Sequence, residues 1–160
     1  MTPLALPADL KMSFRAQSRL CDDLETVADS MPARVDRQFC LAVAKQIVPV
    51  LREAHAVEKR FIVPLIAGRV LDGAELVNGL EAEQVEDECF ADEVEYELLQ
   101  LASGGPVIAP ETTGYMLRGF FAGLRRHMRH VMALLVIARG ADGPDDGGDR
   151  LPTRTGRSPG

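Results

Sequence analysis

The chain lacks the features of several large protein classes. It has no Trp and only two Tyr in 160 residues, so a surface on which nucleic-acid bases stack is not expected. Acidic side chains outnumber basic ones and give a net charge of -6, which also disfavours nucleic acid as a partner. The three cysteines, Cys21, Cys40 and Cys89, are odd in number and far apart. This pattern indicates reduced thiols rather than a disulfide framework.

Signals for membranes, export and common catalysis are missing as well. No apolar run is long enough to span a bilayer, and no apolar signal-peptide segment follows the first basic residue, Lys11. We therefore expect a cytoplasmic protein without a membrane partner. The sequence contains no Gly-rich phosphate loop, CxxC, HExxH or nucleophile elbow. An enzymatic function is for this reason not the favoured interpretation.

Four long segments carry apolar residues at steps of three and four, and none alternates with the period of a strand. The pattern predicts an all-α protein with helices over about 13–30, 35–67, 80–102 and 112–138. Pro49 lies inside the second segment and should kink or split that helix. Four helices with short connections are typical of an antiparallel up-down-up-down bundle.

The composition also predicts where the domain begins and ends. Residues 12–140 form the predicted bundle, and residues 1–11 are expected to be a flexible N-terminal segment. Residues 141–160 are rich in Gly, Pro, Asp and Arg and lack a core pattern, so we expect a disordered tail.

The last predicted helix carries one polar residue in its apolar seam. The seam is Leu117, Phe120, Leu124, His127, Val131, Leu134 and Ala138. The other three seams contribute polar members near their middles, namely Gln17, Cys21, Glu58, Gln84 and Asp87, with Glu88 beside them. Antiparallel packing would bring several of these side chains to one level, which is how metal sites are built in bundle cores.

Three passages carry a resemblance to the hemerythrin-like (HHE cation-binding) family, over about 125 residues. LREAHAVEKRFIVPLI is similar to the family's second-helix motif L-x-x-H-x-x-x-E-E-x-x-L-F-P-x-L. LEAEQVEDECFADEVEYELLQL resembles the third-helix motif, which begins L-x-x-E-H. YMLRGFFAGLRRHMRHVMALLVIA resembles the fourth-helix motif L-R-x-H-I-x-x-E-E-x-x-L-L-P.

The resemblance implies a non-haem di-iron centre held by histidines and bridging carboxylates, but this chain departs from the pattern. Glu58 and His127 stand where the family presents ligands. At other ligand positions the chain has Cys21, Ala54, Gln84 and Val131, and His55 is displaced by one residue. Ala and Val donate nothing to a metal, and two irons need many ligands. A standard oxygen-carrying centre is therefore not expected.

Three hypotheses remain open. The favoured one is a module for binding, sensing or regulation that has lost most di-iron ligands, binds no cofactor, and holds a Glu58–His127 contact with Gln84 donating to the carboxylate. The second is an altered iron or zinc centre that handles dioxygen, nitric oxide or peroxide, with Cys21, Glu58, Glu88 and His127 as ligands and Gln84 and His55 as weaker candidates.

The third hypothesis is a histidine phosphotransfer bundle that uses His55 on its surface. A solvated surface histidine without a function is the simpler interpretation of that residue. The partner is expected to be a protein or a small ligand, and a homodimer through Phe121 and Leu135 is a further expectation.

Overall fold

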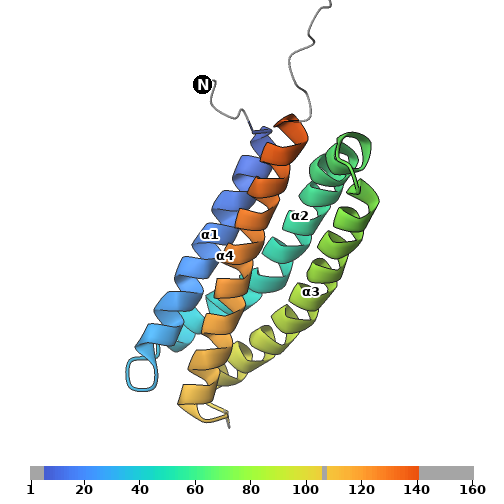
Figure 1. Cartoon of the computed structure of the whole chain (residues 1–160). Helices are drawn as coiled ribbons and strands as arrows, with labels where there is room; N and C mark the ends of the chain where they lie inside the picture. The colour runs from blue at the N-terminus through green and yellow to red at the C-terminus, as the bar shows by residue number, and fades with distance from the viewer. Residues whose placement is uncertain (1–5, 106–107, 141–160) are drawn as a thin grey trace, which may run out of the picture.

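The chain folds into an antiparallel four-helix bundle (Figure 1). The structure is a computed structural model, and it describes residues 6–105 and 108–140. The helices are α1 (Ala8–Ser30), α2 (Arg37–Arg69), α3 (Gly73–Ser103) and α4 (Pro110–Gly140), and the described residues contain no strand. Helix α1 contacts α2 and α4, and α3 contacts the same two helices from the other side. The predicted fold class and up-down-up-down order are confirmed.

Two helices begin earlier than predicted. Helix α1 starts at Ala8 rather than near Ser13, and Leu10 in its first turn is buried. Residues 8–11, expected to be flexible, are therefore helical. Helix α3 starts at Gly73, so residues 73–79, expected to be a connector, form its first turns. Both extensions bury apolar side chains at one end of the bundle, which outweighs weak local propensity. Residues 1–5 and the predicted tail, 141–160, lie outside the described part of the chain.

Helix ends carry the expected capping chemistry at two loops. The side chain of Asp36 accepts a hydrogen bond of 3.1 Å from the backbone N–H of Phe39, which caps the start of α2. Gly104 ends α3 with a positive φ of 71°, and its N–H bonds to the carbonyl of Leu101. A residue with a Cβ is strained in that conformation, so glycine suits this C-cap.

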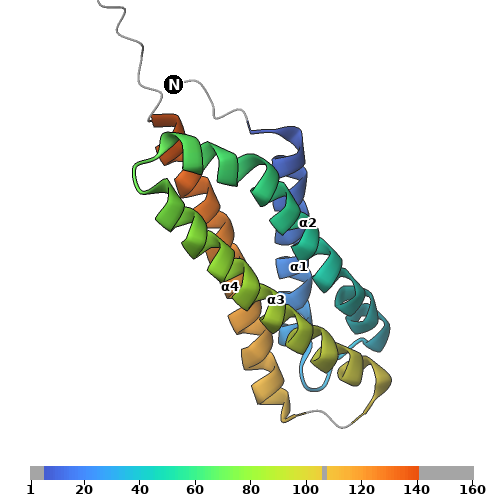
Figure 2. The same ribbon diagram turned by 90° about the vertical axis from the view of Figure 1, so that its right-hand side faces the viewer.

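Helix α2 is continuous through Pro49 and Pro64, so of the two predicted outcomes at Pro49, a kink or a split, the split does not occur. Figure 2 shows that its last turns bend away from the axis of the rest of the helix. Steps of three and four from Glu58 predict Phe61 and Leu65 as the next buried residues of this helix. Ile62 and Ile66 are buried in place of Phe61 and Leu65, because a 3.6-residue helix drifts relative to a seam of shorter period.

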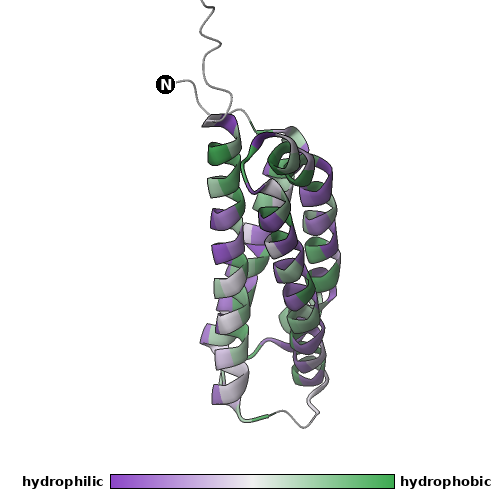
Figure 3. Ribbon diagram, turned by 45° about the vertical axis from the view of Figure 1, so that its right-hand side comes forward, coloured by the Kyte–Doolittle hydropathy of each residue, from purple (hydrophilic) through white to green (hydrophobic). Residues whose placement is uncertain are grey.

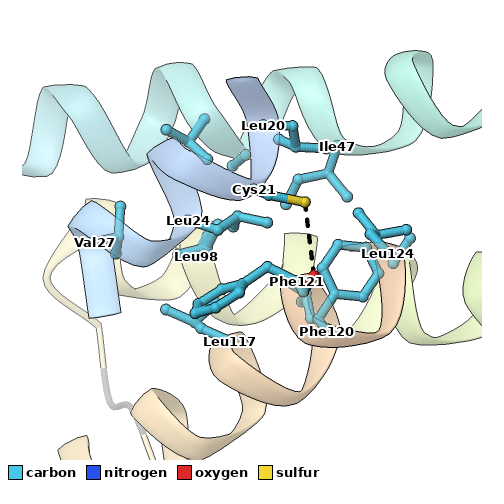
Figure 4. Packing of buried hydrophobic residues seen from close by; sticks show 14 of the residues in the cluster. Leu20, Cys21, Leu24, Val27, Ile47, Leu98, Leu117, Phe120, Phe121 and Leu124 are labelled. Atoms are coloured by element: carbon cyan, nitrogen blue, oxygen red, sulfur yellow. Dashed lines mark hydrogen bonds between the residues drawn. The ribbon is translucent and has the colours of Figure 1, made fainter. Parts of the chain in front are cut away.

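The core consists of two apolar clusters, one toward each end of the bundle. The first contains Leu20, Leu24, Ile47, Leu98 and Phe120 among others (Figure 4). The second contains Leu10, Val57, Ile62, Leu80 and Val131 among others. Apart from Thr113 near the start of α4, the buried polar residues lie where the first cluster gives way to the second along each helix, namely Ser13, Gln17, His55, Glu58, Gln84 and His127. Figure 3 shows polar and apolar residues following one another along all four helices. The helices thus align one polar layer across the bundle.

The side chains of Phe121 and Leu135 are not at the surface, as the expected dimer contact requires. Phe121 and Leu135, proposed to form a dimer surface, are 6% and 3% exposed and face the interior of the chain. They cannot meet a second copy without unfolding part of the bundle. Cys40 is buried in the first cluster. Within the described residues, none of the helices is long and apolar enough to cross a membrane.

We expect Phe120→Ala to lower the free energy of unfolding by about 3–5 kcal/mol, because truncating a buried aromatic leaves a cavity. Phe120 is 2% exposed and packs edge-on against Phe90, with ring centroids 5.3 Å apart. Tyr96→Ala, at a residue 60% exposed, is the control and should change stability by less than about 0.5 kcal/mol. Urea denaturation measures both, and equal losses would contradict the assigned core.

Candidate functional site

The polar layer is centred on a hydrogen-bonded trio from three helices. Glu58 on α2 lies with Oε1 2.8 Å from Nε2 of His127 on α4. The amide Nε2 of Gln84 on α3 donates to the other carboxylate oxygen of Glu58 at 2.6 Å. Glu58 and His127 are 1% and 5% exposed. The predicted contact between Glu58 and His127, with Gln84 donating to the carboxylate, is confirmed.

The trio continues outward to the surface through Glu83. The Nδ1 atom of His127 lies 3.0 Å from Oε2 of Glu83, and the Nδ1 atom of His130 lies 3.2 Å from the same oxygen. Glu83 and His130 have side chains 42% and 37% exposed. A continuous row of hydrogen bonds therefore joins the solvent-facing side of α4 to the buried carboxylate.

A cleft between α3 and α4 reaches this row from the solvent. Its volume is about 490 Å³, and it is lined by Glu83, Glu86, Asp87, Gly123, Arg126, His127 and His130. Carboxylates line its α3 side, and basic side chains line its α4 side. Gly123 contributes to the opening, since a Cβ at that position would touch only the far end of Arg126.

The electrostatics of the layer favour a charged imidazole. Burial lowers the pKa of His127, but the hydrogen bond and charge of Glu58, the hydrogen bond to Glu83 and the charge of Asp87 together raise it to about 9. His127 is then an imidazolium at neutral pH that donates from both ring nitrogens. Burial raises the pKa of Glu83, but the hydrogen bonds to His127 and His130 outweigh that effect and lower it. Burial raises the pKa of Asp87, although His127 and His55 oppose the change.

His55 is buried, and its interpretation as a surface histidine is wrong. The residue is 3% exposed, and its Nδ1 lies 2.7 Å from Oε1 of Glu88, whose side chain is half exposed. Its ring meets that of His127 edge to face, with centroids 6.3 Å apart and an angle of 72° between the planes. A phosphodonor protein cannot reach so deeply buried a ring, which removes the basis of the phosphotransfer hypothesis.

Cys21 does not join the polar layer. It lies in the first apolar cluster, where its thiol donates to the carbonyl of Phe121 at 3.7 Å (Figure 4). Burial raises its pKa to about 11, only partly offset by Arg125, so the thiol stays protonated. Glu88 contacts His55 rather than Glu58. The four ligands predicted for an altered centre are therefore not brought together. Over residues 6–105 and 108–140, no three His, Cys, Asp or Glu side chains form a group spaced to hold a metal ion.

Sequence reasoning missed Glu83 and His130. The signal for both was present in the spacing of residues. His130 stands three residues after His127 on the same side of α4, and Glu83 directly precedes the seam residue Gln84. A seam pattern does not identify either residue, because their side chains reach into the layer from the edge of the seam.

A four-helix bundle with a buried histidine–carboxylate layer contributed by α2, α3 and α4 defines the class of this protein. The sequence model of the hemerythrin HHE cation-binding domain matches residues 10–134, so the chain belongs to that family. No curated protein and no solved structure shows a significant match to this chain.

The di-iron centre of the family does not fit the side chains present. The ligand positions held by Ala54 and Val131 carry only hydrocarbon, and both residues are buried. Both oxygens of Glu58 and both ring nitrogens of His127 are already used in hydrogen bonds. Two irons would therefore lack donors on α2 and α4, where hydrocarbon cannot supply them.

We expect Glu58→Ala and His127→Ala each to destabilise the protein by about 3–5 kcal/mol, because each leaves a buried charge without its partner. The double variant should lose less than the sum of the two, with a coupling of about 0.5–3 kcal/mol. The exposed pair Arg118–Asp29 is the matched control, for which a coupling of about 0.2–1 kcal/mol is expected. Strict additivity at Glu58 and His127 would show that they do not interact.

Stability should also fall as the pH rises from about 6.5 to about 9. The folded-state pKa of His127 is raised from 6.5 to about 9, so its contribution is complete below 6.5 and lost as the pH rises through 9. The amplitude is on the order of 3 kcal/mol. Urea denaturation with a chelator present, compared with the same series for His127→Gln, isolates this group. Parallel pH profiles for the two proteins would refute the assignment.

Proposed function

We propose that this hemerythrin domain is a binding and sensing module rather than an oxygen carrier. The observation that carries the proposal is the Glu83–His127–Glu58–Gln84 row, in which an imidazolium takes up the donors that a di-iron centre would need. A domain of this family with such a core keeps the four-helix fold and the buried polar layer. It lacks the donor atoms that are needed to bind two irons.

The cleft between α3 and α4 supports a binding role. It connects solvent with a row of hydrogen bonds that ends at Glu58 in the middle of the bundle. A ligand that contacts Glu83 or His130 therefore changes the electrostatic potential at the His127–Glu58 pair. That pair is connected to Glu83 directly, and to His130 through Glu83, by hydrogen bonds. Because that pair links α2 to α4, a change in its protonation alters the contact between two helices. This is the physical basis on which we assign sensing and regulation.

The cleft also limits what enters. Its volume of about 490 Å³ admits an ion or a small polar molecule, and its lining is charged on both sides. A large apolar ligand would cover the charged groups of this lining without giving them hydrogen-bond partners, which is unfavourable. The ligand class that suits this lining is small and charged.

Protein expressed in iron-supplemented medium should contain well under two irons per chain and show no oxo-to-iron absorption band. The physical reason is the lack of donors at Ala54 and Val131. Elemental analysis and an ultraviolet–visible spectrum measure both quantities. Apo protein incubated anaerobically with ferrous iron and then exposed to air provides the control for incomplete loading. About two irons with an oxo-to-iron band in either sample would overturn the proposal.

A further inference from the structure

The α3–α4 cleft holds two charges of opposite sign that do not pair with each other. Glu83 is already bonded to His127 and His130, at 3.0 and 3.2 Å. One turn further along α3, Asp87 lines the same cleft, and Arg126 lines it from α4. Within the described residues, neither Asp87 nor Arg126 makes a hydrogen bond or an ion pair. The cleft therefore offers one acceptor group and one donor group to a bound molecule.

The placement of these two groups suits a ligand that enters between the helices. Asp87 is partly buried and its carboxylate has no donor, so a cationic group that enters beside it stabilises it. On the α4 side, a guanidinium nitrogen of Arg126 lies 3.9 Å from the position that a Cβ at Gly123 would take. The guanidinium thus lies across the glycine, at the wall of the cleft. Such a group binds a carboxylate through two parallel hydrogen bonds.

A ligand with charge of only one sign meets one wall of the cleft unfavourably. An anion on Arg126 lies near Glu86 and Asp87, and a cation on Asp87 lies near Arg126 and His130. A zwitterion satisfies both walls at once. The volume of about 490 Å³ has room for a molecule of the size of an amino acid.

We propose that the α3–α4 cleft binds a small zwitterion of amino-acid size, whose ammonium group contacts Asp87 and whose carboxylate contacts Arg126. This names the ligand class for the proposed binding role and rests on that role. The bound zwitterion ties α3 to α4 by charge-assisted hydrogen bonds. Because Asp87 interacts electrostatically with His127, an ammonium group at Asp87 also changes the potential at the buried row.

L-Glutamine is the probe, because its side chain is polar and uncharged. Two analogues each lack one charge: 4-aminobutanamide lacks the carboxylate, and glutaramate lacks the ammonium group. Isothermal titration calorimetry on the full chain, with a chelator present, measures all three. We expect one glutamine to bind per chain, and each analogue to bind at least about tenfold more weakly, because each leaves one charged wall without a partner.

Two substitutions remove the proposed contacts one at a time. Asp87→Asn and Arg126→Gln should each weaken glutamine binding by at least about tenfold. Asp87→Asn should leave the affinity for glutaramate nearly unchanged, and Arg126→Gln that for 4-aminobutanamide. Glu81→Gln and Arg129→Gln are the matched controls, at exposed residues of α3 and α4 outside the cleft lining, and should change affinity by less than about twofold.

A third substitution closes the cleft without removing a charge. Gly123→Leu should abolish glutamine binding, since a Cβ there has room and the longer side chain extends into the cleft. Leucine also favours a helix more than glycine does, so this variant should fold. Ala122→Leu, at the exposed neighbouring residue, is its control and should bind glutamine normally. Should Asp87→Asn fail to fold, the Gly123→Leu result decides.

The outcomes separate this inference from the proposed function. Equal affinity for 4-aminobutanamide and glutamine would show a cation site, and equal affinity for glutaramate would show an anion site. Either result, or no binding of glutamine, overturns the zwitterion inference. Unchanged glutamine binding in Gly123→Leu does so as well, because the ligand then sits elsewhere. None of these results bears on the missing iron ligands, whereas two irons with an oxo-to-iron band would refute the proposed function itself.

Discussion

The burial of Glu58 is the constraint on which the rest of the site depends. An ionised carboxylate in a bundle core destabilises the fold by several kcal/mol unless it is paired and hydrogen-bonded. Here the pairing requires donors from two other helices, His127 on α4 and Gln84 on α3. The register of three helices is thereby tied to one side chain, and a slip of one turn in α3 or α4 would leave the carboxylate unpaired.

The apolar clusters on either side of the polar layer make this constraint effective. Packing of Phe120 and Leu98 on one side and of Leu80 and Val131 on the other keeps bulk water from the layer. In such surroundings a charged hydrogen bond is stronger than in water, and an unpaired polar atom is more unfavourable. Solvent approaches the layer at two places: the α3–α4 cleft reaches Glu83, and the half-exposed side chain of Glu88 reaches His55.

Much of this arrangement could be predicted from the sequence. The seam of α4 is buried at all of its predicted positions, His127 included, because an amphipathic helix in a bundle has only one face to bury. The Glu58–His127–Gln84 contact is predictable because these three are polar members of different helix seams and can satisfy one another's hydrogen bonds. Val131 and Ala54 as lost ligands followed from the family resemblance. The helix starts at Ala8 and Gly73 could not be predicted, since tertiary contacts rather than local sequence stabilise those turns.

The sequence by itself therefore determined the bundle, its polar layer and the absence of donors at two ligand positions, because these depend on residue type and helical period alone. Only the tertiary structure decided which groups His55, Cys21 and Glu83 contact. His55 is buried against Glu88 because α3 packs along that side of α2. Cys21 falls in an apolar cluster because it lies too far along α1 to reach the layer. Glu83 joins the hydrogen-bond network because α3 and α4 pack at a separation that lets its carboxylate reach His127 and His130. The periodicity of a sequence does not encode the separation of two helices.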